Sequence, residues 1–282
     1  MKIKFLIYII ITVIGISVLS LQFFSQENPE NNKQFSDEVK KTKLDTPSLF
    51  NIYGFEDQFE IIHGKKTWNN VKFELNSQNN ELYVKLRYVP DENTIVVFPI
   101  FTAIAYNEPG FYTYYREECN EECLTIEIQK EPPLNFLSSG NGFQVLKLLG
   151  YESITDIDVD QKPDLLKQYD KVILLHNEYV TKKEFDAITN HPNVIYLYPN
   201  ALYAEIKVDY SDNLMTLQRG HNFPESEIRN GFDWKFDNSP LEYNTDCMDM
   251  GFDRIDNGWM LNCYPERSIH QSKVLLEMIK GF

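Results

Sequence analysis

The sequence is short of positive charge. Its 282 residues hold 27 Lys and Arg against 42 Asp and Glu, which gives a formal net charge of -15. Such a surface repels the phosphates of nucleic acids, and no run of Lys and Arg interleaved with aromatic residues offers a local exception. We therefore expect no nucleic-acid partner.

Cysteine is also scarce, and none lies between Cys123 and Cys247. This absence excludes a nucleophilic-cysteine mechanism for the part of the chain between them. The four cysteines form two local pairs, Cys119 with Cys123 and Cys247 with Cys263. A zinc site needs clustered thiolates or a nearby histidine group, and these pairs lie far apart in the chain. An even count in an exported chain favours two disulfides.

The N-terminus contains a long apolar stretch. Lys2 and Lys4 precede residues 5–24, which carry no charge. Twenty helical residues span the roughly 30 Å hydrocarbon layer of a bilayer. The segment "SVLSLQFF" is a poor cleavage site, which favours an uncleaved transmembrane signal anchor over residues 1–25; a cleaved signal peptide is the alternative. The positive-inside rule then predicts a single-pass cell-membrane protein with a cytoplasmic N-terminus and an extracytoplasmic bulk.

The composition changes twice after this stretch. Residues 26–48 are polar and charged, which predicts a flexible linker. Residues 49–130 hold short β-rich runs such as "VKFELNS" and "ELYVKLRYV", separated by turn compositions. In the second run apolar residues alternate with mostly charged ones, as in a strand with one wet face. We expect a small antiparallel β domain here.

Residues 131–282 show a different pattern, in which strands alternate with helices. The apolar runs "KVILL" and "NVIYLYP" are typical of buried parallel strands, and a helix is expected between them from about 181 to 189. This predicts a flavodoxin-like or amidotransferase-like parallel sheet flanked by helices. The stretch from about 210 to 266 is rich in turn residues, acids and aromatics, and indicates an insertion closed by the second disulfide. The segment "SKVLLEMIKGF" is typical of a final amphipathic helix.

Polar side chains follow both predicted parallel strands. Thr181 and Glu184 form a capping box, so the helix starts just after "HNEYV". This places His176 and Glu178 at the carboxyl end of a strand, where ligands bind in open α/β sheets. Asn200 follows the next strand, and we expect it on the same rim as a ligand-binding residue.

The region from 134 to 206 resembles the class I glutamine amidotransferase-like fold. More narrowly, it is similar to the carboxyl-terminal domain of N,N-dimethylformamidase large-subunit-like proteins. The resemblance rests on "YDKVILLHNEYVT", a strand followed by H-x-E-Y, and on "LYPNALY", a strand followed by N-x-x-Y.

This resemblance implies an iron site made of two tyrosines and a glutamate. The matching positions are Tyr179 and Tyr203, with Glu266 as the metal-binding glutamate and Glu242 as a second candidate for it. Phenolates and carboxylates suit a Lewis-acidic ion that activates water and polarises an amide. His176 and Glu178 are then the candidate catalytic proton carriers.

The sequence also departs from this family. The aromatic residue expected after each tyrosine is replaced by Val180 and Ala204, and the usual glycine pair before the second strand is replaced by "HPN". "GNGFQV" lacks the third glycine of a dinucleotide fingerprint and fits a helix cap better, so we expect no nucleotide cofactor. The acids of "DCMDMGFDRIDNG" lack the spacing of an EF-hand and favour a solvated loop over a calcium site.

Three functions are compatible with the sequence. We expect a membrane-anchored, extracytoplasmic binding or surface-assembly protein without a cofactor, which recognises a small polar ligand or another envelope protein. The alternative is an iron-dependent amide hydrolase. A third interpretation is a purely structural role, in which a partner covers the aromatic patch of Tyr112, Tyr114 and Tyr115.

Overall fold

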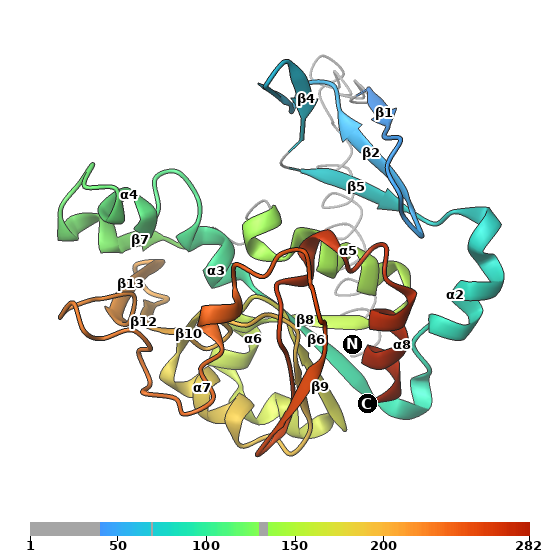
Figure 1. Cartoon of the computed structure of the whole chain (residues 1–282). Coiled ribbons are helices and arrows are strands. Elements are labelled where there is room, and N and C mark those ends of the chain that lie inside the picture. Colours follow the sequence, from blue (N-terminus) through green and yellow to red (C-terminus); the bar gives the residue numbers. More distant parts are fainter. Residues whose placement is uncertain (1–39, 69, 130–134) are drawn as a thin grey trace, which may run out of the picture. The chain divides into compact units, whose positions relative to one another are not determined.

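The computed structural model describes residues 40–68, 70–129 and 135–282. Lys40–Phe282 forms one compact unit, built around a six-stranded sheet (Figure 1). The strands lie in the order β14 (Phe252–Ile255), β15 (Gly258–Leu261), β11 (Val194–Tyr196), β9 (Lys171–Leu174), β6 (Thr94–Phe98) and β8 (Glu152–Thr155).

The five strands from β15 to β8 are parallel, and β14 is an antiparallel edge strand. Numbered along the chain, the parallel strands lie in the order 2-1-3-4-5, which is the order of flavodoxin-like doubly wound sheets. The strand order reverses between β6 and β9. Connections leave this point toward both faces of the sheet, so their first residues border a crevice at the carboxyl ends of the strands.

Alternate residues of the strands serve two hydrophobic cores. On one face, α5 (Gly140–Leu148) and α8 (Lys273–Gly281) pack on Val96, Ile173, Ile195 and Leu261. On the other, α6 (Asp156–Gln161), α7 (Lys182–Thr189) and the 3₁₀ helix Pro163–Gln168 pack on the intervening positions, such as Val97, Val172 and Val194. Burial of both faces explains why these strands read as continuous apolar runs.

A second sheet continues from the carboxyl ends of the central strands. It has the order β10 (Tyr179–Thr181), β12 (Ala204–Asp209), β13 (Leu214–Arg219) and β7 (Thr125–Glu127). Its apolar face packs on α3 (Ile100–Ala105), which follows β6, and on Phe111 of α4 (Phe111–Tyr115). Strands β10 and β12 are parallel and hold the two polar segments after β9 and β11 side by side.

The first described residues form small antiparallel elements. Strands β1 (Lys41–Lys43), β2 (Asn51–Phe55) and β5 (Val71–Glu74) make one sheet, β3 (Glu60–Ile62) and β4 (Lys65–Thr67) make a hairpin, and α2 (Asn80–Leu86) follows. Phe50, Phe73 and Tyr83 share a hydrophobic cluster with residues of α5 and α8. The remaining short 3₁₀ helices are Ser77–Asn79, Pro90–Glu92, Glu121–Leu124, Phe136–Ser138, Ser239–Leu241 and Pro265–Arg267.

Several predicted elements need correction. The run "ELYVKLRYV" contains helix α2, not a strand, because Tyr83 and Leu86 are buried one helical turn apart while Val84 is 72% exposed. Strand β6 lies in the centre of the parallel sheet, so residues 49–130 also contribute to the α/β core. The segment from 210 to 266 supplies the sheet strands β14 and β15 and is more than a cover. The end of the predicted linker, Lys41–Lys43, pairs with β2.

The predicted fold class and cell-membrane location are also corrected. Within the described ranges, no helix is long and apolar enough to cross a membrane. The segments predicted as anchor (1–25) and as most of the linker (26–39) lie outside the described residues. The fold of the described residues is mixed α/β with several sheets.

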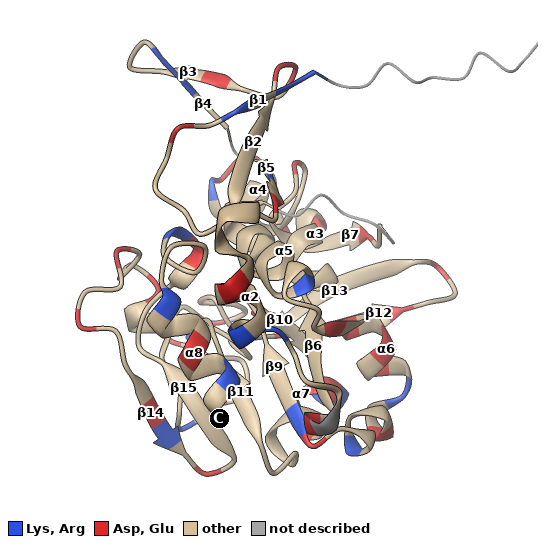
Figure 2. Ribbon diagram, turned by 90° about the vertical axis from the view of Figure 1, so that its right-hand side faces the viewer, with Lys and Arg blue, Asp and Glu red and all other residues tan. Residues whose placement is uncertain are grey.

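The disulfide prediction is confirmed. Cys119 pairs with Cys123, and Cys247 pairs with Cys263 across the hairpin β14–β15. Disulfides are typical of oxidising compartments. Acidic and basic residues lie interspersed over the outside of the folded unit, as Figure 2 shows, so the net negative charge is not gathered on one face.

Candidate functional site

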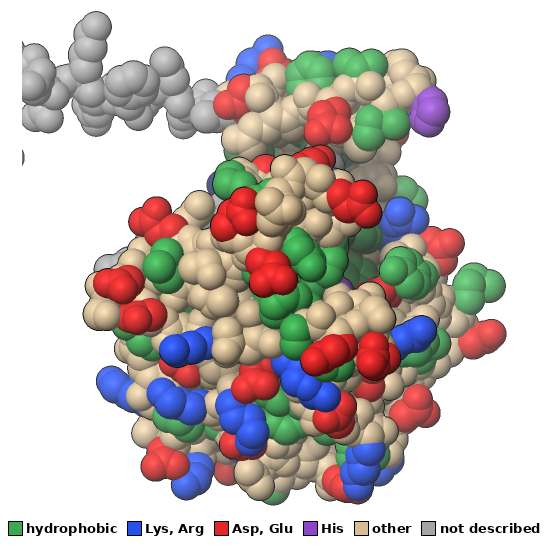
Figure 3. Space-filling model, turned by 90° about the vertical axis from the view of Figure 1, so that its left-hand side faces the viewer, with side chains coloured by type: hydrophobic (Ala, Val, Ile, Leu, Met, Phe, Trp, Pro, Cys, Tyr) green, Lys and Arg blue, Asp and Glu red, His purple; other side chains and the backbone are tan. Residues whose placement is uncertain are grey.

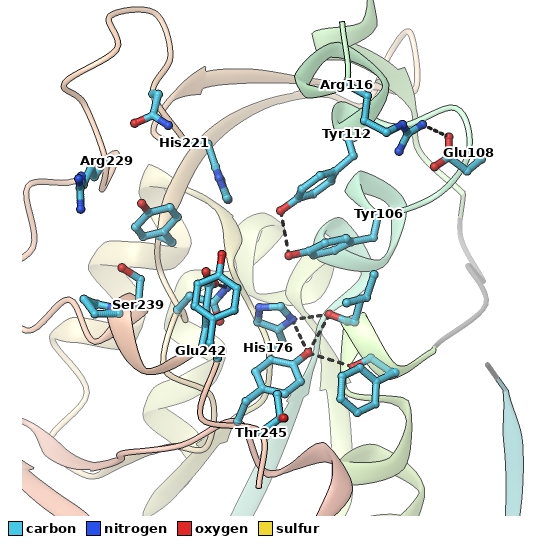
Figure 4. A pocket seen from close by; sticks show the side chains of 18 residues that line it. Tyr106, Glu108, Tyr112, Arg116, His176, His221, Arg229, Ser239, Glu242 and Thr245 are labelled. Atoms are coloured by element: carbon cyan, nitrogen blue, oxygen red, sulfur yellow. Dashed lines mark hydrogen bonds and ion pairs between the residues drawn. The ribbon is translucent and has the colours of Figure 1, made fainter. Parts of the chain in front are cut away.

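A cavity of about 800 Å³ opens at the carboxyl ends of β6, β9 and β11, where the strand order reverses (Figure 4). Tyr106 reaches it from the end of α3 after β6, His176 from the turn after β9, and Asn200 from the turn after β11. We call it the rim cavity. Its lining consists of Tyr106, Glu108, Tyr112, Arg116, Phe136, Leu137, His176, Asn200, Tyr203, His221, Asn222, Arg229, Ser239, Pro240, Glu242, Tyr243, Thr245 and Tyr264.

Backbone hydrogen bonds fix the two polar turns next to each other. The amide of Leu202 donates to the Asn177 carbonyl (2.8 Å), and the amide of Tyr203 donates to the Glu178 carbonyl (2.9 Å). The amide of Glu178 in turn donates to the Thr102 hydroxyl of α3 (2.9 Å). Three connections of the sheet are therefore tied together beneath the cavity.

Glu178 is a fully buried carboxylate at the centre of this network. One oxygen accepts a hydrogen bond from Nε2 of His221, and the other accepts one from the Tyr106 hydroxyl (2.8 Å). Burial raises the pKa of Glu178, but the charges and hydrogen bonds of His221, with His176 and Tyr106, outweigh burial and lower it below its ordinary value. Glu178 is therefore ionised at neutral pH.

His221 comes from the far end of β13 and is held by a tight turn. Gly220 and Phe223 exchange both backbone hydrogen bonds, at 2.9 and 3.0 Å, around His221 and Asn222, which both have positive φ. This is a two-residue hairpin turn. The His221 ring stacks on Tyr179 with the ring centres 5.4 Å apart. A carboxylate only accepts hydrogen bonds, so the partner of Glu178 is the Nε2–H group of His221.

His176 is buried on the floor of the rim cavity and is 1% exposed. Its Nδ1 bonds to the Leu137 carbonyl, which can only accept, so Nδ1 carries the hydrogen. Burial lowers the pKa of His176, although Glu178, the Leu137 carbonyl and the Asn200 side chain oppose this shift. The imidazole is therefore neutral at pH 7, with a lone pair on Nε2. That atom lies 3.4 Å from Glu178 Oε2 and forms no hydrogen bond to the described residues.

Asn200 is 1% exposed and lies beside His176. Its Nδ2 donates to Glu242 Oε2 (2.9 Å), which fixes the orientation of the amide. Its Oδ1 is buried and has no hydrogen-bond partner among the described residues. Burial, followed by the charge of Glu178 among other groups, raises the pKa of Glu242.

The predicted metal ligands do not meet in the rim cavity. Glu266 is fully buried, and its oxygens accept hydrogen bonds from the backbone amides of Asn141 and Gly142 at the start of α5 and from the Tyr198 hydroxyl (2.5 Å). Burial raises the pKa of Glu266 to about 7. This carboxyl group caps a helix and does not line the cavity.

The two predicted phenolate ligands also differ in their surroundings. Tyr203 lines the cavity, whereas Tyr179 is fully buried in the core beside Phe111 and does not line it. Burial raises the pKa of both hydroxyls, that of Tyr179 strongly, which disfavours phenolates. Tyr203 and Glu242 line the cavity, whereas Tyr179 and Glu266 do not. Because the two tyrosines do not meet in the cavity, the residues present do not fit the implied iron site.

The aromatic patch of Tyr112, Tyr114 and Tyr115 lies next to the rim cavity. The three side chains are only partly exposed, and they pack on one another. Tyr112 and Tyr115 also contact the His221 ring. Figure 3 views the face over α4, β12 and β13, where hydrophobic side chains gather among acidic residues. Of the three tyrosines, Tyr112 lines the rim cavity.

Sequence reasoning missed His221, Tyr106 and Tyr264. "GHNF" carries the signature of a two-residue turn, and a histidine there could have drawn attention. Tyr106 follows β6 and its helix, so recognition of "TIVVF" as a parallel strand would have placed it on the rim. Tyr264 follows β15, and nothing local marked that segment as a strand of the sheet.

Neither the models of known protein families nor the curated proteins give a match to this chain.

Proposed function

We propose that this protein binds a small polar organic ligand in the rim cavity. The observation that carries the proposal is the combination of an open cavity and unpartnered polar atoms on its floor. The cavity of about 800 Å³ has the size of small-molecule sites, and aromatic walls with a few convergent polar groups are typical of them. On its floor, His176 Nε2 and Asn200 Oδ1 are buried without hydrogen bonds to the described residues, which costs free energy until a polar group reaches them.

The position of the cavity supports the same proposal. The reversal of strand order in a doubly wound sheet is where ligands bind, because the connections diverge there and leave a crevice. The resemblance to amidotransferase-like domains is in keeping with this site, although fold analogy alone does not transfer an activity. Tyr179 and Glu266 do not line the cavity, which counts against the iron-dependent amide hydrolase, so binding is the function that the geometry supports best.

A cavity-filling substitution tests this proposal. Ser239 lines the cavity, and Ser239→Trp should fill part of it, while Ser226→Trp on an exposed loop is the matched control. Saturation-transfer NMR would use a mixture of amino acids, amines, amides and simple sugars. We expect signals with the wild type and Ser226→Trp, and their loss with Ser239→Trp. Absence of signals with all three proteins, or signals that survive in Ser239→Trp, would refute binding at this site.

A further inference from the structure

We infer that the rim cavity recognises a primary ammonium group, held by His176 Nε2 and Asn200 Oδ1. The inference deepens the proposed ligand-binding function and rests on it. It names the chemical class of the ligand, an organic amine R–NH₃⁺ whose substituent lies among the aromatic walls of the cavity.

The first argument concerns the free acceptors. The hydrogen on His176 Nδ1 is bound to the Leu137 carbonyl, so Nε2 presents a lone pair. The Asn200 amide is oriented by Glu242, so Oδ1 also presents lone pairs. Both atoms are buried and lack hydrogen-bond partners among the described residues, and the two side chains lie next to each other. Two adjacent acceptors require a ligand group that brings at least two donors.

The second argument concerns three donors beside these acceptors, each of which already has a partner. The Tyr106 hydroxyl donates to Glu178, and the Tyr264 hydroxyl lies 3.0 and 3.1 Å from the carbonyls of Phe136 and Leu137. Nδ2 of Asn200 donates to Glu242. These three groups therefore leave the two acceptors without a donor.

The excess of free acceptors over free donors at His176 and Asn200 distinguishes an ammonium ligand from other classes of ligand. An ammonium group has three donors and no acceptor, so it satisfies both atoms and leaves nothing of its own unpaired. A primary amide brings a carbonyl oxygen for which Tyr106, Tyr264 and Asn200 have no free donor. A quaternary ammonium has no hydrogen-bond donor and cannot bond to either acceptor. A carboxylate has only acceptor oxygens, which the lone pairs of His176 Nε2 and Asn200 Oδ1 would repel.

Charge and aromatic rings favour the same class. Glu178 Oε2 lies 3.4 Å from His176 Nε2, and the Glu242 carboxyl group lies on the other side of Asn200. The rings of Tyr106 and Tyr264 have their centres 5.8 and 5.2 Å from the His176 ring, so aromatic side chains, which attract cations to their faces, flank this place. Arg116 is held by Glu108 and Glu118 and does not compete for this place.

Calorimetric titration with four probes tests the inference. At constant ionic strength and pH 7, n-butylammonium should bind, and butyramide and tetramethylammonium should bind about tenfold more weakly or worse, because hydrogen bonds to charged groups are strong. Sodium chloride is the control for inorganic cations. Equal binding of butyramide, of tetramethylammonium or of sodium would overturn the assignment of an ammonium donor group.

A pair of variants locates the binding. Asn200→Leu removes one acceptor and should weaken n-butylammonium binding about tenfold or more. Asn190→Leu removes an exposed amide at the residue that follows α7, outside the cavity lining, and should leave the affinity unchanged. Equal affinity of the two variants would overturn the inference. Thermal unfolding would verify that both variants are folded.

A spectroscopic measurement keeps the inference testable if Asn200→Leu does not fold. In wild-type protein labelled with ¹⁵N-histidine, His176 should show the Nδ1–H tautomer, and n-butylammonium should shift the Nε2 resonance while that of exposed His63 stays in place. An unchanged Nε2 resonance at saturation would refute the contact. If other compounds bind in the cavity and n-butylammonium does not, the ammonium assignment fails while the proposed ligand-binding function stands.

Discussion

Glu178 shows how a single buried carboxylate organises the rim cavity. Two donors, the His221 Nε2–H group and the Tyr106 hydroxyl, converge on its two oxygens. Glutamine has the same shape but replaces one oxygen by an NH₂ group, so one of these donors would face another donor. A buried donor without an acceptor costs about 1–3 kcal/mol.

Glu178→Gln should therefore lower the free energy of unfolding at pH 7 by about 1–3 kcal/mol. The pKa of Glu178 is lowered below 4.5 in the folded state, so the carboxylate stabilises the fold above pH 4.5 and loses this effect as the pH falls through the folded value. The difference from wild type should shrink below pH 4.5 in urea unfolding. Glu122→Gln, on an exposed side chain, is the control and should change little.

Glu266 has the opposite pH dependence. Its pKa is raised from 4.5 to about 7 by burial, so the folded state holds the proton more tightly than the unfolded chain. Wild-type stability should fall as the pH rises from about 4.5 to about 7 and then stay level. The glutamine in Glu266→Gln does not titrate. The free energy of unfolding of this variant, relative to that of the wild type, should therefore rise by up to about 3 kcal/mol between pH 4.5 and pH 7. A carboxyl ¹³C titration of Glu266 with a midpoint near 4.5 would contradict this account.

At the scale of elements, helix α5 depends on a residue that is distant in the chain. The sequence "GNGFQV" predicted a helix cap here, and Gly150, which has φ +88°, follows the end of the helix. The cap is supplied by the Glu266 carboxyl group, which binds the amides of Asn141 and Gly142. A cap supplied from 125 positions away has no local signature. The capping box of α7, which Thr181 and Glu184 form within four residues, was confirmed because all its atoms are local.

Gly142 is the point where α5 touches its distant partners. A Cβ atom there would lie 2.4 Å from the Tyr198 hydroxyl oxygen. Gly142→Ala should thus displace Tyr198 from Glu266 and destabilise the protein by about 1–3 kcal/mol, although alanine is the better helix former. Gly281→Ala in α8 has open space around it and should be neutral or stabilising. Thermal unfolding of both variants measures the contrast, and equal melting temperatures would contradict the packing argument.

Helix α2 shows why some elements could not be predicted. Leu82, Val84, Leu86 and Tyr88 alternate as in a strand, but the structure buries Tyr83 and Leu86 against α8 and the small β-sheet. The apolar residues of this segment are compatible with a strand period of 2 residues and with a helical period of 3.6 residues. Which of the two forms depends on packing partners that are distant in the sequence. By contrast, β9 and β11 were visible because strands buried on both faces are continuously apolar.

At the scale of the whole molecule, the first described segment shares a hydrophobic cluster with the α/β part. The cluster on one face of the central sheet joins Phe50, Phe73 and Tyr83 of the first segment to Val145 of α5 and Leu275 of α8. The Leu49 amide also donates to the His270 carbonyl (2.9 Å). The β-rich segment predicted as a domain over 49–130 thus has no core of its own among the described residues, and we expect it to unfold together with the α/β part.

Tryptophan fluorescence can test this cooperativity, because the chain has three tryptophans in different places. Trp68 donates to the Phe55 carbonyl (2.9 Å) beside the small sheet, and Trp259 lies in β15 and stacks on Phe282. One variant would keep only Trp68 and the other only Trp259, with phenylalanine at the remaining positions. A shared core predicts the same urea midpoint for both probes and for far-UV circular dichroism. A Trp68 transition at lower urea than the Trp259 transition would mean that the β-rich segment folds as a separate domain. Two segments that bury residues against each other unfold together, so one can unfold first only if they do not share a hydrophobic cluster.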